Sequence, residues 1–167
     1  MASAATAPDQ VDLIVADLDL YTQGEIIALA LNVNANLRDS PPIGTPIDTG
    51  WASANWLPSI GSPKTVDGEP ADPKAGPTAG EVAQRAAMAA EGENDVLSWR
   101  LQDGPIFATN NVPYIAALNA GHSPQSPRGF VLNAIIKAIN QTKSVGAAKA
   151  GRARRSAAFK ARRRSPR

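Results

Sequence analysis

The pattern of apolar and polar positions predicts helices towards both ends of the chain and strands between them. Apolar residues recur every three or four positions over 26–37, which is typical of one buried face of a helix. Thr22 and Glu25 match a capping box, in which a hydroxyl and a carboxylate accept hydrogen bonds from the first amides of a helix. A helix is therefore expected from Thr22 to about Arg38, where a Pro-Pro pair follows. The segment 11–20 fits either a helix or a strand.

The middle of the chain predicts an antiparallel sheet. Residues 52–60 predict a strand, in which Ala52, Ala54 and Trp56 would share one face, although Pro58 weakens its far end. Two further apolar runs, 96–101 and 106–109, flank an Asp-Gly pair that favours a hairpin turn. The expected fold class is therefore α+β, with a small antiparallel sheet of three to four strands packed by helices. Residues 61–77 are rich in Pro, Gly and Asp and predict a long exposed loop.

Three more helices are expected after this loop. A second capping box, Thr78 to Glu81, predicts a helix through about residue 90. Pro113 can open a short helix over 114–119, with Gly121 as its left-handed stop. A last helix is expected to start near residues 126–127. The first of these helices would pack through a narrow face of Val82, Ala83, Ala86 and Ala90, and the last through Phe130, Val131, Ala134, Ile135, Ala138 and Ile139.

Composition divides the chain into an acidic body and a basic tail. A length of 167 residues predicts one domain, residues 1–142, with a basic tail over 143–167 that is expected to be flexible when free. The tail carries ten basic and no acidic residues, so the other seven basic and fifteen acidic residues leave the body at net −8. No apolar run approaches the ~20 residues that cross a bilayer, and the start of the chain lacks a signal-peptide pattern. Absence of cysteine excludes disulfides and a thiol nucleophile.

Three turn-rich motifs stand out from this pattern: residues 45–50, 110–114 and 121–127. Their proline residues fix φ, their glycines permit positive φ, and Asp and Asn side chains can bond to their own backbone. Such chemistry predicts rigidly shaped loops rather than a reactive centre. The residues expected to be critical for these turns are Pro46, Asp48, Gly50, Asn111, Pro113 and Gly121.

The order of these motifs resembles a known family. T-P-x-D-T-G at 45–50, then Trp56, then N-N-V-P-Y at 110–114 and the Gly/Ser/Pro/Gln cluster at 121–127 are similar to tail-component proteins of tailed bacteriophages. These are the neck or tail-completion proteins, the minor tail protein Z type among them. The resemblance runs over 26–140. This chain departs from the family at Trp51, where Arg is frequent, and at Ala116, Asn119 and Ala120, where acidic and aromatic residues are frequent.

The resemblance implies a structural role in the virion. A protein of this kind is expected to form a hexameric ring at the head–tail junction, which completes one end of the tail and lets it join a filled head. Its expected partners are further copies of itself and other phage neck, connector, tail-tube and terminator proteins. It would be assembled in the host cytoplasm, without a cofactor and without enzymatic activity.

Two other classes of function are weighed against this one. Asp48-Thr49-Gly50 matches the catalytic triplet of aspartic proteases, but that chemistry needs a second carboxylate to share a proton, and a bulky Trp51 follows. His122 is the only histidine, so a zinc site or a serine triad has little support, and no metal site is expected. The remaining alternative to a structural role is a small nucleic-acid-binding protein with a basic tail.

Candidate contact residues follow from side-chain type. Trp51 and Tyr114 are candidates for an interface, since aromatic residues are enriched at interface hot spots, whereas Trp56 and Trp99 are expected in the core. Cationic side chains in the tail would contact DNA phosphates without reading sequence, or would bind an acidic partner surface. A membrane role is not expected, because the tail lacks an apolar stripe. The candidate tail contacts are Arg152, Arg154, Arg155, Arg162, Arg163 and Arg164.

Overall fold

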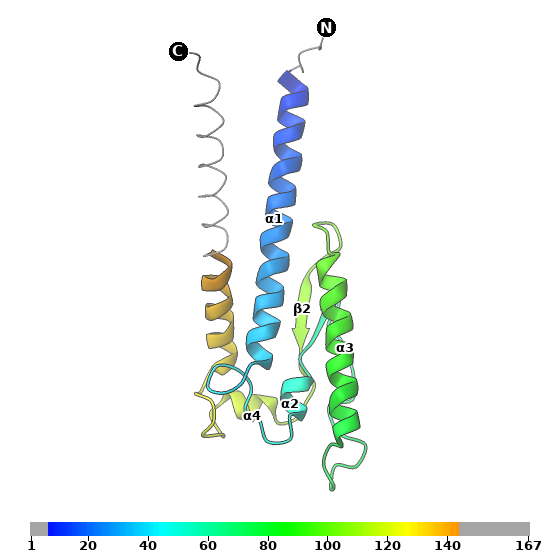
Figure 1. Cartoon of the computed structure of the whole chain (residues 1–167), viewed down its shortest axis with the longest axis vertical. Helices are drawn as coiled ribbons and strands as arrows, with labels where there is room; N and C mark the ends of the chain where they lie inside the picture. The colour runs from blue at the N-terminus through cyan, green and yellow to red at the C-terminus, as the bar shows by residue number, and fades with distance from the viewer. Residues whose placement is uncertain (1–6, 144–167) are drawn as a thin grey trace, which may run out of the picture.

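The fold is a set of helices packed around a two-stranded sheet (Figure 1). A computed structural model describes residues 7–143 of the chain. The predicted α+β class is confirmed, whereas the predicted basic tail lies outside the described residues apart from Lys143. In chain order the elements are α1 (Ala7–Arg38), α2 (Trp51–Ala54), β1 (Leu57–Ile60), α3 (Ala79–Leu97), β2 (Ile106–Thr109), α4 (Ile115–Asn119) and a helix over 130–143, here called the C-terminal helix.

α1 is one continuous helix, and it is longer than the sequence pattern predicts. The ambiguous segment 11–20 is helical, and the predicted end at Arg38 is confirmed. The expected start at Thr22 is wrong. No Pro or other helix breaker stands between residue 11 and Thr22, so the helix continues through the capping box. Extending an existing helix gains one hydrogen bond for each residue that is fixed, whereas starting a new helix is unfavourable. Its N-terminal half extends past the rest of the described fold (Figure 1).

The sheet has two antiparallel strands over the described residues rather than three to four. In the β1–β2 register, Leu57 lies opposite Thr109 and Ile60 opposite Ile106. The expected strand over 52–60 is correct only from Leu57 onwards, because residues 51–54 form the single helical turn α2. Gly50 starts that turn, and its carbonyl accepts a hydrogen bond from the Ala54 amide at 2.9 Å.

The predicted hairpin around Asp103 and Gly104 is also wrong. Val96 belongs to α3 and is buried, so no strand precedes this turn. The Asp103 carboxylate instead accepts the Arg100 amide at 2.7 Å, and the Gly104 carbonyl accepts the Trp99 indole N–H at 2.8 Å. These bonds close a turn that connects α3 to β2, and β2 then pairs with β1.

α3 begins at the predicted capping box and covers β1. The Thr78 side chain accepts the Glu81 amide, and the Glu81 carboxylate accepts the Thr78 amide, so the box is confirmed. The helix runs seven residues beyond the expected end, to Leu97, and its face differs from the predicted one: Ala83 and Ala90 are exposed. Its buried residues are Ala89, Gly92 and Val96.

The core lies where the end of α1 meets the C-terminal helix and α4. It is formed by Leu37, Trp56, Phe130 and Ala134. The Trp56 indole donates to the Thr45 hydroxyl at 2.7 Å, and that hydroxyl donates to the Leu37 carbonyl at 2.8 Å, so the polar atoms buried here are paired. The predicted core positions of Trp56 and Trp99 are confirmed, as both are buried.

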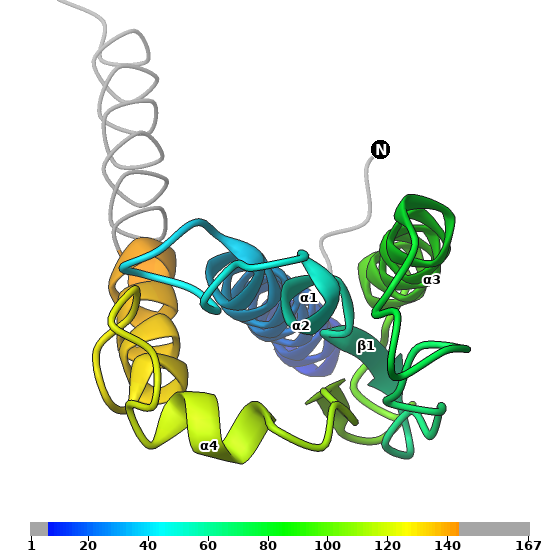
Figure 2. The same ribbon diagram turned by 90° about the horizontal axis from the view of Figure 1, so that it is seen from below.

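The C-terminal helix begins at residue 130, slightly later than expected, with Phe130, Ala134 and Ala138 fully buried. Ile135, predicted on the same stripe, is exposed. Viewed from below, α1 lies between the C-terminal helix and α3 (Figure 2). Glu93 of α3 fixes one of these contacts, because its carboxylate accepts from Asn34 and Arg38 of α1, at 2.7 and 3.1 Å.

Candidate functional site

The three turn motifs identified in the sequence meet around one small cavity. We call residues 45–50, 110–114 and 121–127 together the turn cluster. Because more than sixty positions separate the first motif from the second, this meeting is a property of the tertiary fold and not of local sequence. The cavity has a volume of about 200 Å³ and is lined by Pro46, Asp48, Thr49, Gly50, Trp51, Ala52, Tyr114, Leu118, Ser123 and Gln125.

Hydrogen bonds tie the first motif to the third. The Gln125 side-chain oxygen accepts the Ile47 amide at 2.8 Å. The buried Ser126 hydroxyl donates to the Gly44 carbonyl, also at 2.8 Å. Neither Gln125 nor Ser126 was among the residues expected to be critical, because a polar side chain that bonds across 78 or 82 positions leaves no local sequence signal.

Two glycines have the positive φ that the turn chemistry requires. Gly50 lies at φ +82° and Gly121 at φ +93°, in the left-handed region that other residues rarely adopt. Gly121 ends α4: its amide donates to the Leu118 carbonyl at 3.0 Å, and the next amide, of His122, donates to Ala117 at 3.2 Å. This pair of bonds is a Schellman motif, which turns the chain towards the third motif.

The second motif is fixed by two neighbouring asparagines. Asn110 accepts the Val112 amide at 3.1 Å and donates to the Ala52 carbonyl of α2 at 2.8 Å. Asn111 donates to the Lys64 carbonyl at 3.0 Å, which ties the motif to the loop over 61–77. Sequence reasoning singled out Asn111, but Asn110 makes the contact that joins the motif to α2.

Trp51, named above as a candidate interface residue, lies in the interior of this fold and not on its surface. Its side chain is only 2% exposed, and its indole N–H donates to the Gly68 carbonyl at 2.8 Å. The guanidinium of Arg85 lies 5.2 Å from the ring centroid, within the range of a cation–π contact. A Cβ at Gly68 would overlap the Asn111 carbonyl, so the loop lies tightly against the second motif. Trp51 therefore anchors the 61–77 loop to the body.

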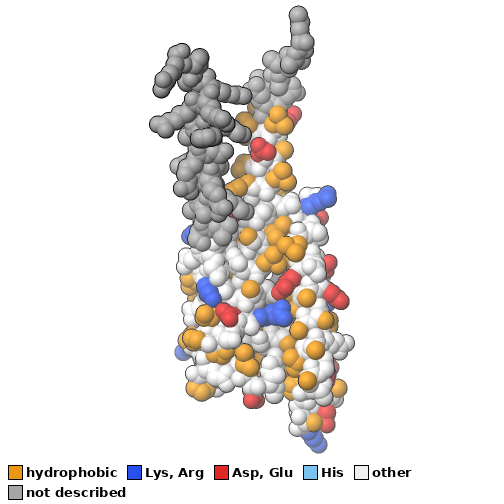
Figure 3. Space-filling model, viewed as in Figure 1, with side chains coloured by type: hydrophobic (Ala, Val, Ile, Leu, Met, Phe, Trp, Pro, Cys, Tyr) orange, Lys and Arg blue, Asp and Glu red, His pale blue; other side chains and the backbone are white. Residues whose placement is uncertain are grey.

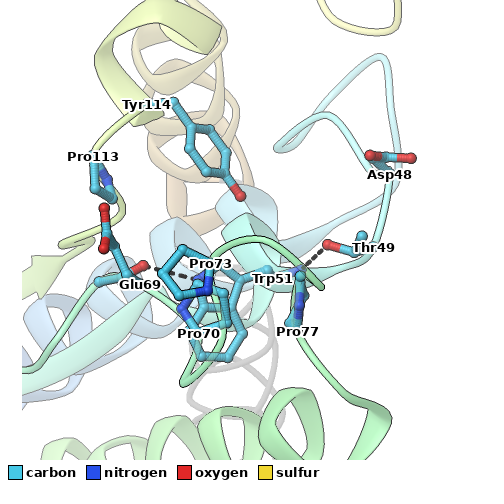
Figure 4. A pocket seen from close by; sticks show the side chains of 11 residues that line it. Asp48, Thr49, Trp51, Glu69, Pro70, Pro73, Pro77, Pro113 and Tyr114 are labelled. Atoms are coloured by element: carbon cyan, nitrogen blue, oxygen red, sulfur yellow. Dashed lines mark hydrogen bonds between the residues drawn. The ribbon is translucent and has the colours of Figure 1, made fainter.

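A second, larger cavity shares part of its wall with the first, and Figure 4 shows side chains that line it. Its volume is about 400 Å³, and Asp48, Thr49 and Tyr114 line both cavities. Tyr114, the other candidate interface residue, is 46% exposed, and the pKa of its phenol is raised, mainly by partial burial and then by the Asp48 carboxylate. Prolines supply much of the remaining wall: Pro70, Pro73, Pro77 and Pro113.

This arrangement is suited to binding by shape rather than to proton transfer. Asp48 and Glu69 are the two carboxylates of the larger cavity, and they lie on opposite sides of it with Trp51 and prolines between them (Figure 4). An aspartic-protease mechanism requires two carboxylates close enough to share one proton. His122 is exposed in the turn after α4. Within residues 7–143, no group of three or more His, Cys, Asp or Glu side chains is placed to hold a metal ion.

A second candidate surface is the N-terminal half of α1. Its large apolar side chains are exposed, and the space-filling view shows them along the part of the helix that rises above the body, interspersed with acidic residues (Figure 3). Contiguous exposed apolar surface of this kind is typical of an interaction site. No helix within residues 7–143 combines the length and hydropathy needed to cross a membrane. The exposed residues are Val11, Leu13, Ile14, Val15, Leu18, Leu20 and Tyr21.

The candidate tail contacts, Arg152 to Arg164, lie outside the described residues.

Comparisons with protein-family models, with curated proteins and with solved structures find no match to this chain.

Proposed function

We propose that this chain is a structural virion protein of the phage head–tail junction, which forms a ring that completes the tail end and allows it to join the head. The observation that carries the proposal is the turn cluster. The three motifs on which the resemblance to tail-completion proteins rests line one cavity; the first and third are bonded to each other, and the second is bonded to α2, which follows the first. They therefore act as one structural unit. This is expected if the order of motifs that this chain has in common with tail-completion proteins reflects a common structure.

The exposed half of α1 supports an assembly role. Seven large apolar side chains over 11–21 are more than half exposed. Leaving such a surface in water is unfavourable, at about 25 cal/mol per Å² of apolar area, so its burial would drive association. A ring needs two different surfaces of one subunit to meet, and the N-terminal half of α1 lies at the opposite end of the molecule from α2 and α4, which border the turn cluster (Figure 1).

The two surfaces have distinct parts in the proposed mechanism. The turn cluster holds a rigid surface around Asp48, Tyr114 and the prolines of the larger cavity, so it can bind a partner with little loss of conformational entropy. The apolar half of α1 supplies burial energy when subunits associate. Many modest contacts then add around the ring, because each closed contact raises the effective concentration of the next.

The oligomeric state of the purified chain and of one turn variant tests this proposal. Wild-type protein should form closed rings by negative-stain electron microscopy and mass photometry. Gly50→Val should lose them, because a β-branched residue is strained at φ +82° and the turn cluster would be displaced. Gly24→Ala is the matched control: Gly24 lies inside α1, a Cβ there meets no atom within 4 Å, and rings should persist.

Wild-type protein that stays monomeric at all concentrations tested, or a Gly50→Val variant that assembles normally, would contradict the proposal. The rival nucleic-acid-binding function is separated by replacing the six arginines from Arg152 to Arg164 with Gln. That change should leave rings intact if the chain is an assembly protein. The nucleic-acid-binding function would be favoured if the variant loses DNA binding and neither the wild-type protein nor the variant forms rings. Phosphate contacts depend on those cations.

A further inference from the structure

The C-terminal helix occupies only part of the α1 face on which it packs. Asn36 of α1 donates to the Ala134 carbonyl at 3.1 Å and to the Gln141 side chain at 2.9 Å. One turn earlier, Asn32 donates to the Thr142 hydroxyl at 3.2 Å. The two helices are therefore antiparallel (Figure 1), and the described chain stops at Lys143, one residue past the Asn32–Thr142 contact.

The same face of α1 continues towards the N-terminus. Steps of three or four residues back from Asn32 keep to one side of a helix and lead through Glu25 to Tyr21, Leu18 and Ile14. Tyr21 is 57% exposed, Leu18 60% and Ile14 67%. The surface that would receive a continuation of the C-terminal helix is thus apolar, with Glu25 within it, and no residue in the range 7–143 covers it.

Charge decides which occupant suits this face. Glu25 lies within this face and Asp17 beside it, about 60° around the helix, whereas Asp12 and Asp19 lie on the far side; residues 11–37 contain no basic side chain. Residues 144–167 contain nine basic side chains and no acidic one. Pairing with α1 of a second copy would bring like charges together, which is unfavourable within a screening length of about 10 Å. The basic segment brings opposite charges, and also Val145, Phe159 and several alanines.

The length of the segment also matches. Its 24 residues would span ~36 Å at helical rise, and residues 11–31 of α1 span ~30 Å. At that rise, continuing the Asn32–Thr142 register places Lys149 level with Glu25 and Phe159 level with Val15. Because the segment is attached at Lys143, next to this face, its effective concentration there is on the order of millimolar.

We propose that residues 144–167 fold back along the N-terminal half of α1 in the same molecule, on the face that carries Ile14, Leu18, Tyr21 and Glu25. Val145, Phe159 and the alanines of the segment lie against this face, and its cations lie beside Asp17 and Glu25. The basic residues are then occupied within the free subunit, and DNA or an acidic partner must compete with α1 for them. Leu13 and Leu20, which lie about 100–120° around the helix from this face, are left uncovered.

Double electron–electron resonance on the full chain tests this contact. The protein has no cysteine, so Ala16→Cys and Ser156→Cys can be spin-labelled without interference. Ala16 is exposed on the side of α1 opposite the proposed contact, so its label leaves the face free. Docking predicts one narrow distance distribution within ~35 Å, set by two helix diameters of ~10 Å each and the label arms. Salt at 1 M should broaden it, because charge attraction is then screened.

Charge variants separate the contact from general effects of acidity. Asp17→Asn and Glu25→Gln together should broaden the distribution at low salt. The matched pair, Glu91→Gln and Asp95→Asn, removes equal charge from exposed positions away from α1 and should leave it narrow. A distribution that is broad in the unmodified labelled chain would overturn the proposal. So would a short distance that disappears on dilution into excess unlabelled protein, since the segment would then come from a neighbouring copy.

Discussion

At the scale of single residues, Glu81 makes the most pH-sensitive contact of the described chain. Its carboxylate accepts the Ala71 amide, the Thr78 hydroxyl and the Thr78 amide, at 2.8, 2.7 and 2.8 Å. These bonds favour the charged form and lower its pKa from 4.5 to about 2, with the Ala71 amide the largest cause. Glu81 thus joins the end of the 61–77 loop to the start of α3.

A depressed pKa in the folded state stabilises the protein above the unfolded pKa, and that stability is lost as pH falls from 4.5 towards 2. Glu81→Gln should therefore lower Tm at pH 7, and the difference from wild type should shrink at pH 2.5. Thermal melts followed by circular dichroism at both pH values test this. Glu91→Gln, an exposed acid on the same helix, is the control. A difference that does not change with pH would contradict the assigned contacts.

The phenol of Tyr114 reports on the geometry of the turn cluster. Its pKa is raised by partial burial and, to a smaller extent, by the nearby Asp48 carboxylate. Asp48→Asn should move that pKa part of the way back towards 10.0, because only the smaller cause is removed. Ultraviolet absorbance titration measures it in a Tyr21→Phe background, which leaves Tyr114 as the sole tyrosine. An unchanged pKa would show that Asp48 does not face Tyr114.

At the scale of elements, two capping-box patterns of the same type had opposite outcomes. Thr78 follows Pro77 at the end of an irregular loop, so the chain had to leave that loop there and the box starts α3. Thr22 follows an apolar run with no breaker, and the helix already in progress passes through it. A capping box therefore predicts a helix start only where the preceding residues cannot be helical. Thr22 does not meet this condition, because the pattern of 11–20 fits a helix as well as a strand.

The strand prediction over 52–60 failed because an alternation of faces, with Ala52, Ala54 and Trp56 on one side, was taken for a sheet pattern. In 51–54 that alternation belongs to one helical turn, and both Trp51 and Trp56 are buried. Gly50 and Gly121 could be predicted, since a local turn determines their φ. The partners of Gln125 and Ser126 could not, because those hydrogen bonds depend on a tertiary arrangement that no local pattern encodes.

Packing of α3 on β1 depends on a glycine. A Cβ at Gly92 would overlap the Pro58 carbonyl oxygen, so the helix and strand approach too closely for a side chain. Gly92→Ala should destabilise the protein by ~1–3 kcal/mol through overpacking, despite a helix-propensity gain of up to ~1 kcal/mol. Urea unfolding measures the change.

Gly80→Ala is the internal control, because it lies in the first turn of α3 with only the Thr78 hydroxyl oxygen near a Cβ, at 3.9 Å. It should be neutral or slightly stabilising. Equal stability of the Gly92→Ala and Gly80→Ala variants would show that α3 and β1 are not packed as closely as described.

At the scale of the whole molecule, the C-terminal half of α1 packs among the other elements, and its N-terminal half, here called the arm, extends past them (Figure 1). The arm is apolar on more than one side, since Leu13 and Leu20 lie away from the face that the C-terminal helix contacts. These two residues are 63% and 66% exposed. In the proposed ring this side of α1 is the one available to a neighbouring subunit.

Leu13→Ser with Leu20→Ser should therefore reduce the fraction of protein in rings several-fold while leaving the Tm of the subunit nearly unchanged, as is usual for exposed positions. Leu132→Ser with Ile136→Ser is the matched control, because both residues are exposed on the C-terminal helix. Sedimentation velocity measures the ring fraction. Equal loss of rings in the two variants would argue that the arm has no specific part in assembly.

The most direct test of the central claim is electron microscopy of lysates from a phage that lacks only this gene. The proposed joining role predicts DNA-filled heads separate from unjoined or aberrant tails, with normal particles restored by the wild-type gene and not by Gly50→Val. Normal infectious virions from the deletion would contradict a role in head–tail joining.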